Sequence, residues 1–371
     1  MDVVRVMRGL GFGLLAACLA GSAPGGDAFG KDAKPALPPR KADAKLAAIL
    51  ARAVDDASEG KFWGTVLVAK GGDVVFEKGW GTSDREGKRP NDAETIFELA
   101  SASKQVAATA ILRLEQQKKL KTSDPIMKFF PTAPDDKKVV TLDHLLHHTS
   151  GLDPNLGVPY AWPGTRDEYT RDMLAKPLVE KPGRKWSYSN VGYALLAAVV
   201  ETVTGDTFEA YCRKDLFAPA GLVDTGFVND EERKDDPRAT LRDCKDSRPE
   251  WTATSWFWGW GYRGMGGVVT TANDLVRWDR ALRGDKLLGK AAKEKLYTPT
   301  LDKYACGWLV DVTPHGKRAF HSGSVCGFRI QVARWLDEDV MIVVLSGDAA
   351  DPYKVEATVA ERFFAYEAKR K

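Results

Sequence analysis

Strand-like runs lie near both ends of this chain, and a long helical stretch separates them. Near the start, Thr65–Phe76 contains two β-rich runs around a Gly71-Gly72 turn, a pattern that predicts a hairpin. Near the other end, three more runs predict strands: Trp308–Val310, Phe328–Val332 and Val340–Leu345. Strands from the two ends can therefore share one antiparallel sheet.

Helical patterns complete the expected fold. Apolar residues recur at helical spacing in four segments: Lys45–Ala57, Ser101–Leu120, Asp274–Leu282 and Val355–Ala368. The stretch from 135 to 262 is mostly helical pattern broken by proline and glycine. We expect an α/β (α+β) fold, in which an antiparallel sheet flanked by helices forms from both chain ends and carries an inserted all-helical subdomain. The expected divisions are 1–30 (export signal), 31–44 (linker), 45–134 with 263–371 (α/β domain) and 135–262 (helical subdomain).

The first residues predict export. Arg5 and Arg8 precede an apolar run, Gly9–Ala20, that is too short to span a bilayer as a mature helix. Leu15–Cys18 resembles a lipobox, in which the cysteine is lipidated and becomes the new N-terminus. The alternative is a plain secretory signal cut near Ala20–Ala23. We expect an exported protein that is periplasmic or attached to the membrane through lipidated Cys18.

The charge balance argues against one class of partner. The formal net charge is +3, and the two signs are interspersed, as in Glu231–Asp235. No basic stripe is present that would favour nucleic acid. We expect a small-molecule or peptidoglycan-like substrate and no nucleic-acid partner.

Four cysteines besides Cys18 would face an oxidising compartment, where disulfides persist. Cys306 and Cys326 flank a predicted hairpin with its turn near Pro314–Lys317, so we expect a disulfide between them. Cys212 and Cys244 would then pair or stay free.

Ser101 and Lys104 form an S-x-x-K motif on a predicted helix. Positions i and i+3 share one helix face, so the serine hydroxyl and the lysine amine can meet. Serine needs a nearby base to act as a nucleophile, and a lysine can serve when burial favours its neutral form. The motif alone is short, and a capping serine beside a surface lysine is the alternative.

Tyr188 and Asn190 form a Tyr-x-Asn motif in a loop before a helical pattern. A tyrosine near a lysine loses its proton more easily and can relay it. Asn190 offers a donor and an acceptor to an amide-bearing substrate. The alternatives are a packed aromatic with a satisfied hydroxyl for Tyr188 and a helix cap for Asn190.

A third segment, His321–Ser324, lies on a predicted edge strand. Gly323 would let a substrate approach the backbone closely. A backbone N–H on this strand could complete an oxyanion hole. Alone, the segment is better explained as an ordinary polar strand end.

Five segments in order resemble the serine β-lactamase and penicillin-binding-protein family, which includes class C β-lactamases, DD-peptidases and related esterases. They are Phe97–Lys104, Thr141–Leu152, Tyr188–Asn190, Gly264–Gly267 and His321–Gly323. The resemblance covers about Lys45 to Leu345 and is far more specific than any single motif. It implies a serine hydrolase that works through an acyl-enzyme, with no cofactor.

The resemblance also implies a role for each site residue. Ser101 would be the acylated nucleophile, and Lys104 and Tyr188 the proton-transfer pair. The N–H groups of Ser101 and Ser324 would form the oxyanion hole, and Asn190 would contact the substrate amide. His144, His147 and His148 have a spacing that could suit metal ligands, but they fall in a helix and turn of the family, so we expect no metal site.

One departure affects the substrate. The family's third motif is typically Lys-Thr-Gly, whereas this chain has His321-Ser322-Gly323. Histidine has a reference pKa near ~6.5, so we expect weak β-lactam hydrolysis, better turnover of uncharged esters, and a decline of carboxylate turnover as pH rises through that pKa. Arg329, on the next strand, is another source of positive charge. The alternatives are a DD-peptidase or β-lactamase, and a non-catalytic binding or sensor protein.

Overall fold

The structure is a computed structural model that describes residues 40, 43–84, 87–155, 162–231, 236, 238, 259–325, 327–347 and 350–370. These residues belong to one compact unit. No described helix is long and apolar enough to cross a membrane. The export signal, its Cys18, and Cys244 and Cys326 lie outside the described residues.

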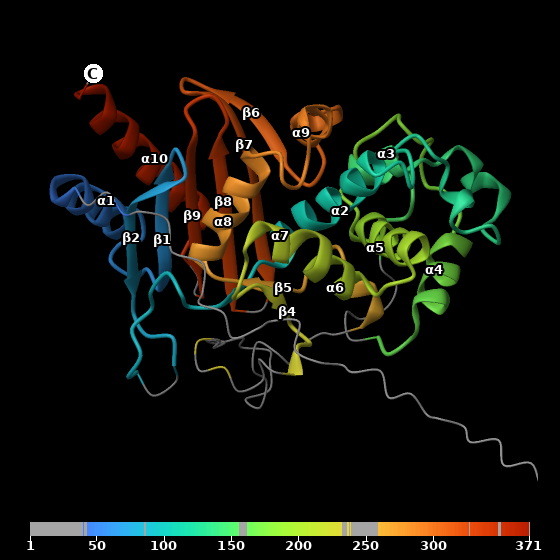
Figure 1. Cartoon of the computed structure of the whole chain (residues 1–371), viewed down its shortest axis with the longest axis horizontal. Coiled ribbons are helices and arrows are strands. Elements are labelled where there is room, and N and C mark those ends of the chain that lie inside the picture. Colours follow the sequence, from blue (N-terminus) through green and yellow to red (C-terminus); the bar gives the residue numbers. More distant parts are fainter. Residues whose placement is uncertain are drawn as a thin grey trace, which may run out of the picture. The chain divides into compact units, whose positions relative to one another are not determined.

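The main sheet joins the two ends of the chain (Figure 1). Its six described strands are β1 (Gly64–Lys70), β2 (Asp73–Trp80), β6 (Leu309–Thr313), β7 (Gly316–Val325), β8 (Phe328–Trp335) and β9 (Val340–Ser346). They run in the order β2-β1-β9-β8-β7-β6, and every neighbouring pair is antiparallel. The β1–β9 pairing, with Leu67 opposite Val343, closes the sheet across most of the sequence.

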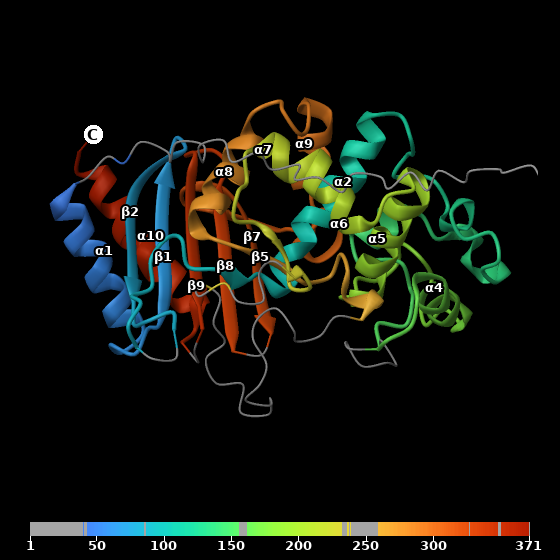
Figure 2. The ribbon, with the colours of Figure 1, turned by 60° about the horizontal axis from the view of Figure 1, so that its bottom comes forward.

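Both faces of the central strands are buried, because side chains alternate between two hydrophobic layers. Val66 and Val344 contribute to one layer, which the helices α1 (Ala44–Ala57) and α10 (Pro352–Ala368) cover. Leu67 and Val343 contribute to the other, larger layer. It includes residues of α2 (Lys104–Gln116) and α8 (Ala272–Arg283). Figures 1 and 2 show the sheet between these two groups of helices.

The expected helical middle region is present beside the sheet. Its α-helices are α3 (Leu142–Leu146), α4 (Arg166–Ala175), α5 (Asn190–Thr204), α6 (Phe208–Tyr211) and α7 (Ala218–Ala220), and a π-helix, Cys212–Phe217, joins the last two. Residues 191–200 of α5 are all buried, which makes α5 the centre of this region. A short strand, β4 (Gly226–Phe227), also belongs to it and pairs with β5 (Val268–Thr270).

A small sheet and several short helices connect the two regions. The small sheet has the order β3-β5-β4, with β3 at Phe97–Glu98. The remaining described α-helix is α9 (Lys290–Tyr297). The described 3-10 helices are η1 (Ala100–Ser103), η2 (Ile126–Lys128), η3 (Asp135–Val139), η6 (Trp260–Tyr262) and η7 (Leu301–Lys303). The predicted helix Ser101–Leu120 therefore begins as η1 and continues as α2, which ends at Gln116 before the left-handed Lys118 (φ 61°).

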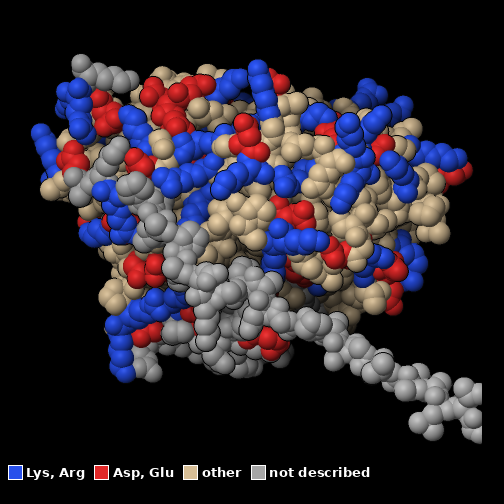
Figure 3. Space-filling model, viewed as in Figure 1, with Lys and Arg blue, Asp and Glu red and all other residues tan. Residues whose placement is uncertain are grey.

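The surface carries both signs of charge. On the face shown in Figure 3, Lys and Arg side chains are interspersed with Asp and Glu. Ion pairs join oppositely charged side chains in the described part of the chain, such as Lys128 with Asp124 and Arg318 with Asp311.

The predicted disulfide is wrong. Cys306 is a free, buried thiol, and its Sγ lies 3.8 Å from Nε2 of His147. The β6–β7 hairpin pairs Leu309 with Phe320. If that register continued to Cys306, the residue opposite would be Gly323 and not Cys326. Cys212 is also a free, buried thiol.

Candidate active site

Ser101 lies at a tight turn between the small sheet and α2. Strand β3 pairs with β5, and the next residue, Leu99, donates its N–H to the carbonyl of Val268 at 2.8 Å. Ala100 then adopts a left-handed conformation (φ 46°), which is uncommon for a residue with a side chain. The half-buried Ser101 follows it within η1, at the start of the helical segment.

Lys104 is fully buried beside that serine. Its Nζ lies 3.3 Å from Oγ of Ser101, 2.8 Å from Oδ1 of Asn190 and 2.9 Å from the carbonyl oxygen of Met265. Burial lowers the pKa of the Lys104 amine well below its usual value of 10.5. A neutral amine has two N–H donors and one lone pair, which fit two acceptors and one hydroxyl donor.

The Tyr-x-Asn motif reaches the same amine from the other side. Nζ of Lys104 lies 4.8 Å from the ring centre of Tyr188, which is half-buried. The cap of α5 is Ser189, whose Oγ accepts the N–H of Gly192 at 3.1 Å. Asn190 is therefore not the cap, and its side chain is available to Lys104.

The carbonyl of Met265 is a site group that the sequence analysis did not single out. The two flanking glycines of its segment explain how the chain reaches Lys104. Gly264 and Gly267 both have positive φ (73° and 83°), and a Cβ on Gly264 would lie 2.3 Å from the carbonyl oxygen of Tyr193. The Gly264–Gly267 segment was the available signal, but nothing in its residue types pointed to a backbone carbonyl as the functional group.

The third segment lies on β7, beyond the part of this strand that pairs with β6. Strand β6 pairs with the first half of β7, Gly316–Phe320, and β8 pairs with it from Arg318 to Val325. From His321 onward, β8 is the only described strand that pairs with β7, so the segment lies at an edge, as predicted. A Cβ on Gly323 would lie 2.0 Å from the carbonyl oxygen of Leu99. Gly323 thus allows close packing against the serine turn, and the substrate approach expected for it stays a prediction.

Ser324 follows this contact and is exposed. Its register partner on β8 is Arg329, which is also exposed. Directly opposed residues of an antiparallel pair point to the same face. Gln331, two residues further along β8, contacts Glu356 of α10. Arg329 therefore lies on the face of the sheet that α10 covers, whereas Gly323 faces the serine turn on the other side.

His321 differs from the expectation for a substrate-binding residue. It is buried, its Nδ1 donates to the carbonyl of Ser322 (2.7 Å) and its Nε2 accepts from the hydroxyl of Tyr304 (3.0 Å). Burial, and then the charge of Lys104, lower the pKa of His321 to about 3. The expected titration near pH 6.5 is therefore wrong, and both ring nitrogens already have protein partners. Tyr304 has no motif that sequence reasoning could have used.

The three neighbouring histidines point to different partners. His144 accepts the N–H of Thr141 in a capping box, His147 approaches Cys306, and His148 accepts the N–H of Ser189 through Nδ1. Among the residues described, no group of three or more His, Cys, Asp or Glu side chains could hold a metal ion.

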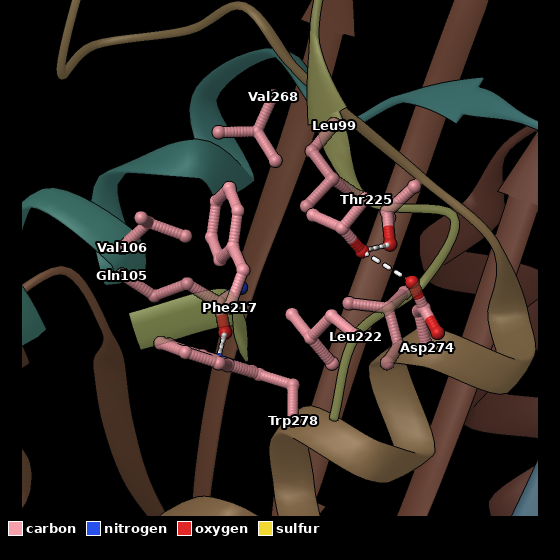
Figure 4. A pocket seen from close by; sticks show the side chains of 11 residues that line it. Leu99, Gln105, Val106, Phe217, Leu222, Thr225, Val268, Asp274 and Trp278 are labelled. Carbon is pink, nitrogen blue, oxygen red and sulfur yellow. Dashed lines mark hydrogen bonds between the residues drawn. The ribbon is translucent and has the colours of Figure 1, made fainter. Parts of the chain in front are cut away.

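A small cavity of about 10 Å³ lies behind the serine turn (Figure 4). Leu99, Phe217 and Val268 line its apolar part, and Thr225 donates to Asp274 at 2.8 Å at its edge. This volume is about the room for one water molecule. Since Ser101, Lys104 and Tyr188 do not line it, the cavity belongs to the support of the site rather than to substrate binding.

Comparison with known proteins agrees with this geometry. The Beta-lactamase family model matches residues 50–364. Penicillin-binding protein 4* of Bacillus subtilis is 31% identical over 317 residues, which are 78% of this chain and 69% of that protein. Esterase EstB of Burkholderia gladioli is 34% identical over 212 residues, which are 52% of this chain and 54% of that protein.

A solved structure extends the likeness to the fold. The penicillin-binding protein from Bacillus halodurans superposes with a TM-score of 0.72 at 26% sequence identity, over 84% of this chain and 99% of that one. The chain belongs to the β-lactamase and penicillin-binding-protein family of serine hydrolases.

Proposed function

We propose that this hydrolase acylates Ser101 with the acyl part of an ester or small amide and then hydrolyses the acyl-enzyme. The observation that carries the proposal is the setting of Lys104, a fully buried amine in contact with Ser101, Asn190 and Met265. A protonated lysine has no lone pair, so only the neutral form favoured by burial can accept the serine proton.

The remaining groups follow from this first step. Lys104 accepts the proton of Ser101 as Oγ attacks the carbonyl carbon, and Tyr188, next to the same amine, passes a proton to the leaving group. The N–H groups of Ser101 and Ser324 stabilise the negative charge on the carbonyl oxygen. Asn190 holds Lys104 through Oδ1 and keeps its amide N–H groups for the substrate. Water then attacks the acyl-enzyme by the reverse proton path.

The third segment favours substrates without a carboxylate beside the scissile bond. Its histidine is neutral, and both ring nitrogens are engaged within the protein. It therefore lacks the charge-assisted attraction that a lysine would give. The 34% identity to a protein named an esterase supports this choice.

A second candidate is a DD-peptidase or β-lactamase activity on peptidoglycan or its mimics. The 31% identity to a penicillin-binding protein supports it. Arg329 does not supply the charge for a carboxylate at the site, because it lies on the face of the sheet that α10 covers.

Intact mass spectrometry tests both candidates. The protein is exposed to a fluorophosphonate and, separately, to a penicillin, and the adduct is mapped by peptide analysis. Label on Ser101, absent from Ser101→Ala, is expected; label on another serine with Ser101 bare contradicts the proposal. Steady-state kcat/KM for a neutral short-chain ester should exceed that for the penicillin. A higher value for the penicillin would favour the second candidate.

We also propose that the chain is exported and lipidated at Cys18. The support is the basic start, the short apolar run and the lipobox-like Leu15–Cys18. Cell fractionation should find the protein with membranes and the Cys18→Ser variant in the soluble fraction. Wild-type protein in the soluble fraction would favour the plain secretory signal.

A further inference from the structure

His148 makes three contacts that hold Tyr188 and the two residues beside it. Its backbone carbonyl accepts the N–H of Ser187 at 2.8 Å, and its Nδ1 accepts the N–H of Ser189 at 3.0 Å. These are the two residues that flank Tyr188. One residue therefore holds the backbone on both sides of the tyrosine.

The imidazole ring of His148 also packs directly on Tyr188. The two ring centres lie 4.4 Å apart with an interplanar angle of 44°. On its other sides the imidazole contacts Tyr304 at 4.4 Å and Tyr193 at 5.0 Å. His148 is only 1% exposed, so these rings leave it little freedom to move.

The backbone of His148 is in the left-handed region (φ 57°). Such a conformation is uncommon for a bulky residue and persists only when the surroundings require it. Glycine or asparagine would adopt it more easily. The histidine is thus kept at a position where the backbone alone would favour another residue.

The hydrogen bond from Ser189 also defines the tautomer. Because Nδ1 accepts an N–H, the proton of the neutral ring is on Nε2. Tyr188, Tyr193 and Tyr304 surround the ring, and the titratable groups near it are Lys104, His321 and His147. Burial, and then these three groups, lower the pKa of His148 well below 6.5, so the acceptor at Nδ1 is kept at neutral pH.

We propose that His148 is the positioning residue for Tyr188: it fixes the backbone and the ring of the tyrosine so that the phenol stays beside Lys104. This inference rests on the proposed function, in which Tyr188 moves a proton. His148 itself touches no reacting atom in that scheme. Its effect should therefore pass entirely through the tyrosine.

Two substitutions separate the ring contact from the hydrogen bond. His148→Phe keeps an aromatic ring but removes the acceptor for the Ser189 N–H. His148→Asn places an amide oxygen near the position of Nδ1 and tolerates the left-handed backbone. For a neutral ester, we expect kcat of His148→Phe to fall on the order of 10²-fold with little change in KM, because a small misplacement of a reacting group has that effect. His148→Asn should recover part of the loss, and the remaining loss reflects the missing ring contact.

His144→Phe is the matched control. His144 lies in the same segment and also accepts a backbone N–H through Nδ1, from Thr141 at 3.2 Å, but it belongs to the cap of α3. This variant should lower the thermal midpoint and leave kcat within about twofold.

A double-mutant cycle with Tyr188→Phe decides whether His148 acts through the tyrosine. The double variant should be no slower than Tyr188→Phe alone. If the two losses multiply, or if folded His148→Phe keeps wild-type kcat, the proposal is overturned. Should His148→Phe not fold, as judged by circular dichroism, the same cycle is run with His148→Asn, whose lost ring contact should slow the wild type but not Tyr188→Phe.

Fluorophosphonate labelling separates this proposal from the function on which it rests. Wild-type protein that does not label at Ser101 contradicts the proposed function itself. Wild-type protein that labels at Ser101, combined with multiplicative losses in the cycle, contradicts only the role of His148.

Discussion

Two of the described lysines are fully buried, and their partners differ. Lys137 has the carboxylate of Asp136 at 2.7 Å. The partners of Lys104 are a hydroxyl, a side-chain amide oxygen and a backbone carbonyl. A carboxylate stabilises the charged ammonium, whereas neutral acceptors in a buried site favour the neutral amine. The setting of Lys104 is therefore that of a base rather than of a structural ion pair.

The neutral His321 leads to a prediction about pH. Its pKa of about 3 means that its charge does not change between pH 5 and pH 8. The ratio of kcat/KM for a penicillin, whose carboxylate stays ionised, to kcat/KM for a neutral ester should therefore stay constant across this range. Parallel pH profiles of the two substrates measure it. A tenfold fall of the ratio between pH 6 and pH 8 would show that His321 titrates near its ordinary pKa and binds the carboxylate.

Glu98 leads to a prediction about stability. Burial raises its pKa to about 7 from 4.5, although the Tyr262 hydroxyl donates to it at 2.5 Å and opposes the rise. Since the folded pKa exceeds the unfolded one, the stabilisation is present below pH 4.5 and is lost as pH rises through 7. Glu98→Gln stays neutral, so relative to wild type it should gain about 3 kcal/mol between pH 4.5 and pH 8.

Urea unfolding at these two pH values checks the Glu98 prediction. The control is Glu361→Gln, at an exposed position on α10. An equal difference between Glu98→Gln and wild type at both pH values would mean that the pKa of Glu98 is the same in the folded and unfolded states.

Part of the arrangement of the active site could be predicted from residue types and their spacing alone. The i, i+3 spacing predicted that Ser101 and Lys104 could meet, and they do at 3.3 Å. The pairing of His321 with Tyr304 could not be predicted, because Tyr304 lies 17 residues away and carries no pattern of its own. Likewise, the acceptor in Met265 is a backbone carbonyl, which every residue has.

At the scale of elements, the contact between β7 and η1 positions the nucleophile. Gly323 permits it, since a Cβ there would lie 2.0 Å from the carbonyl oxygen of Leu99 and 3.2 Å from Cβ of Ala100. We predict that Gly323→Ala separates the strand from the serine turn, destabilises the protein by about 1–3 kcal/mol and lowers kcat at least on the order of tenfold.

Gly284→Ala is the control for that change. A Cβ on Gly284 would come no closer than 3.4 Å to its neighbours, and its φ of −72° suits any residue. Its urea midpoint and kcat/KM should stay near wild type. Wild-type kcat in Gly323→Ala would show that the turn does not depend on this close contact.

Element boundaries were predictable where a pattern was long and uninterrupted. The predicted helix Val355–Ala368 lies within α10, Pro352–Ala368. The predicted edge position of His321–Ser324 is confirmed, although the first half of β7 has a strand on both sides. β6 pairs with only this first half because β6 begins at Leu309, opposite Phe320.

At the scale of the whole molecule, the sheet depends on segments that are almost the full chain apart. Residues 64–70 of β1 pair with residues 340–346 of β9, and α1 packs against α10. Tyr366 of α10 also donates to the carboxylate of Asp43, the cap of α1, at 2.8 Å. The runs at both ends predicted a shared sheet. The order of the strands in it could not be predicted, because the buried strands have similar apolar sequences.

This closure predicts the effect of removing the last helix. Val355, Val359, Phe363 and Phe364 of α10 are each at most 6% exposed. Burying one such side chain stabilises a protein by roughly 1.5–3 kcal/mol, and a whole domain has only about 5–15 kcal/mol. A variant that ends at Asp351 should therefore lose cooperative thermal unfolding and fluorophosphonate labelling of Ser101, whereas a control that ends at Ala368 should keep both. Circular dichroism melting and labelling of the two purified variants check this, and full labelling of the shorter one would show that the active site forms without α10 covering the sheet.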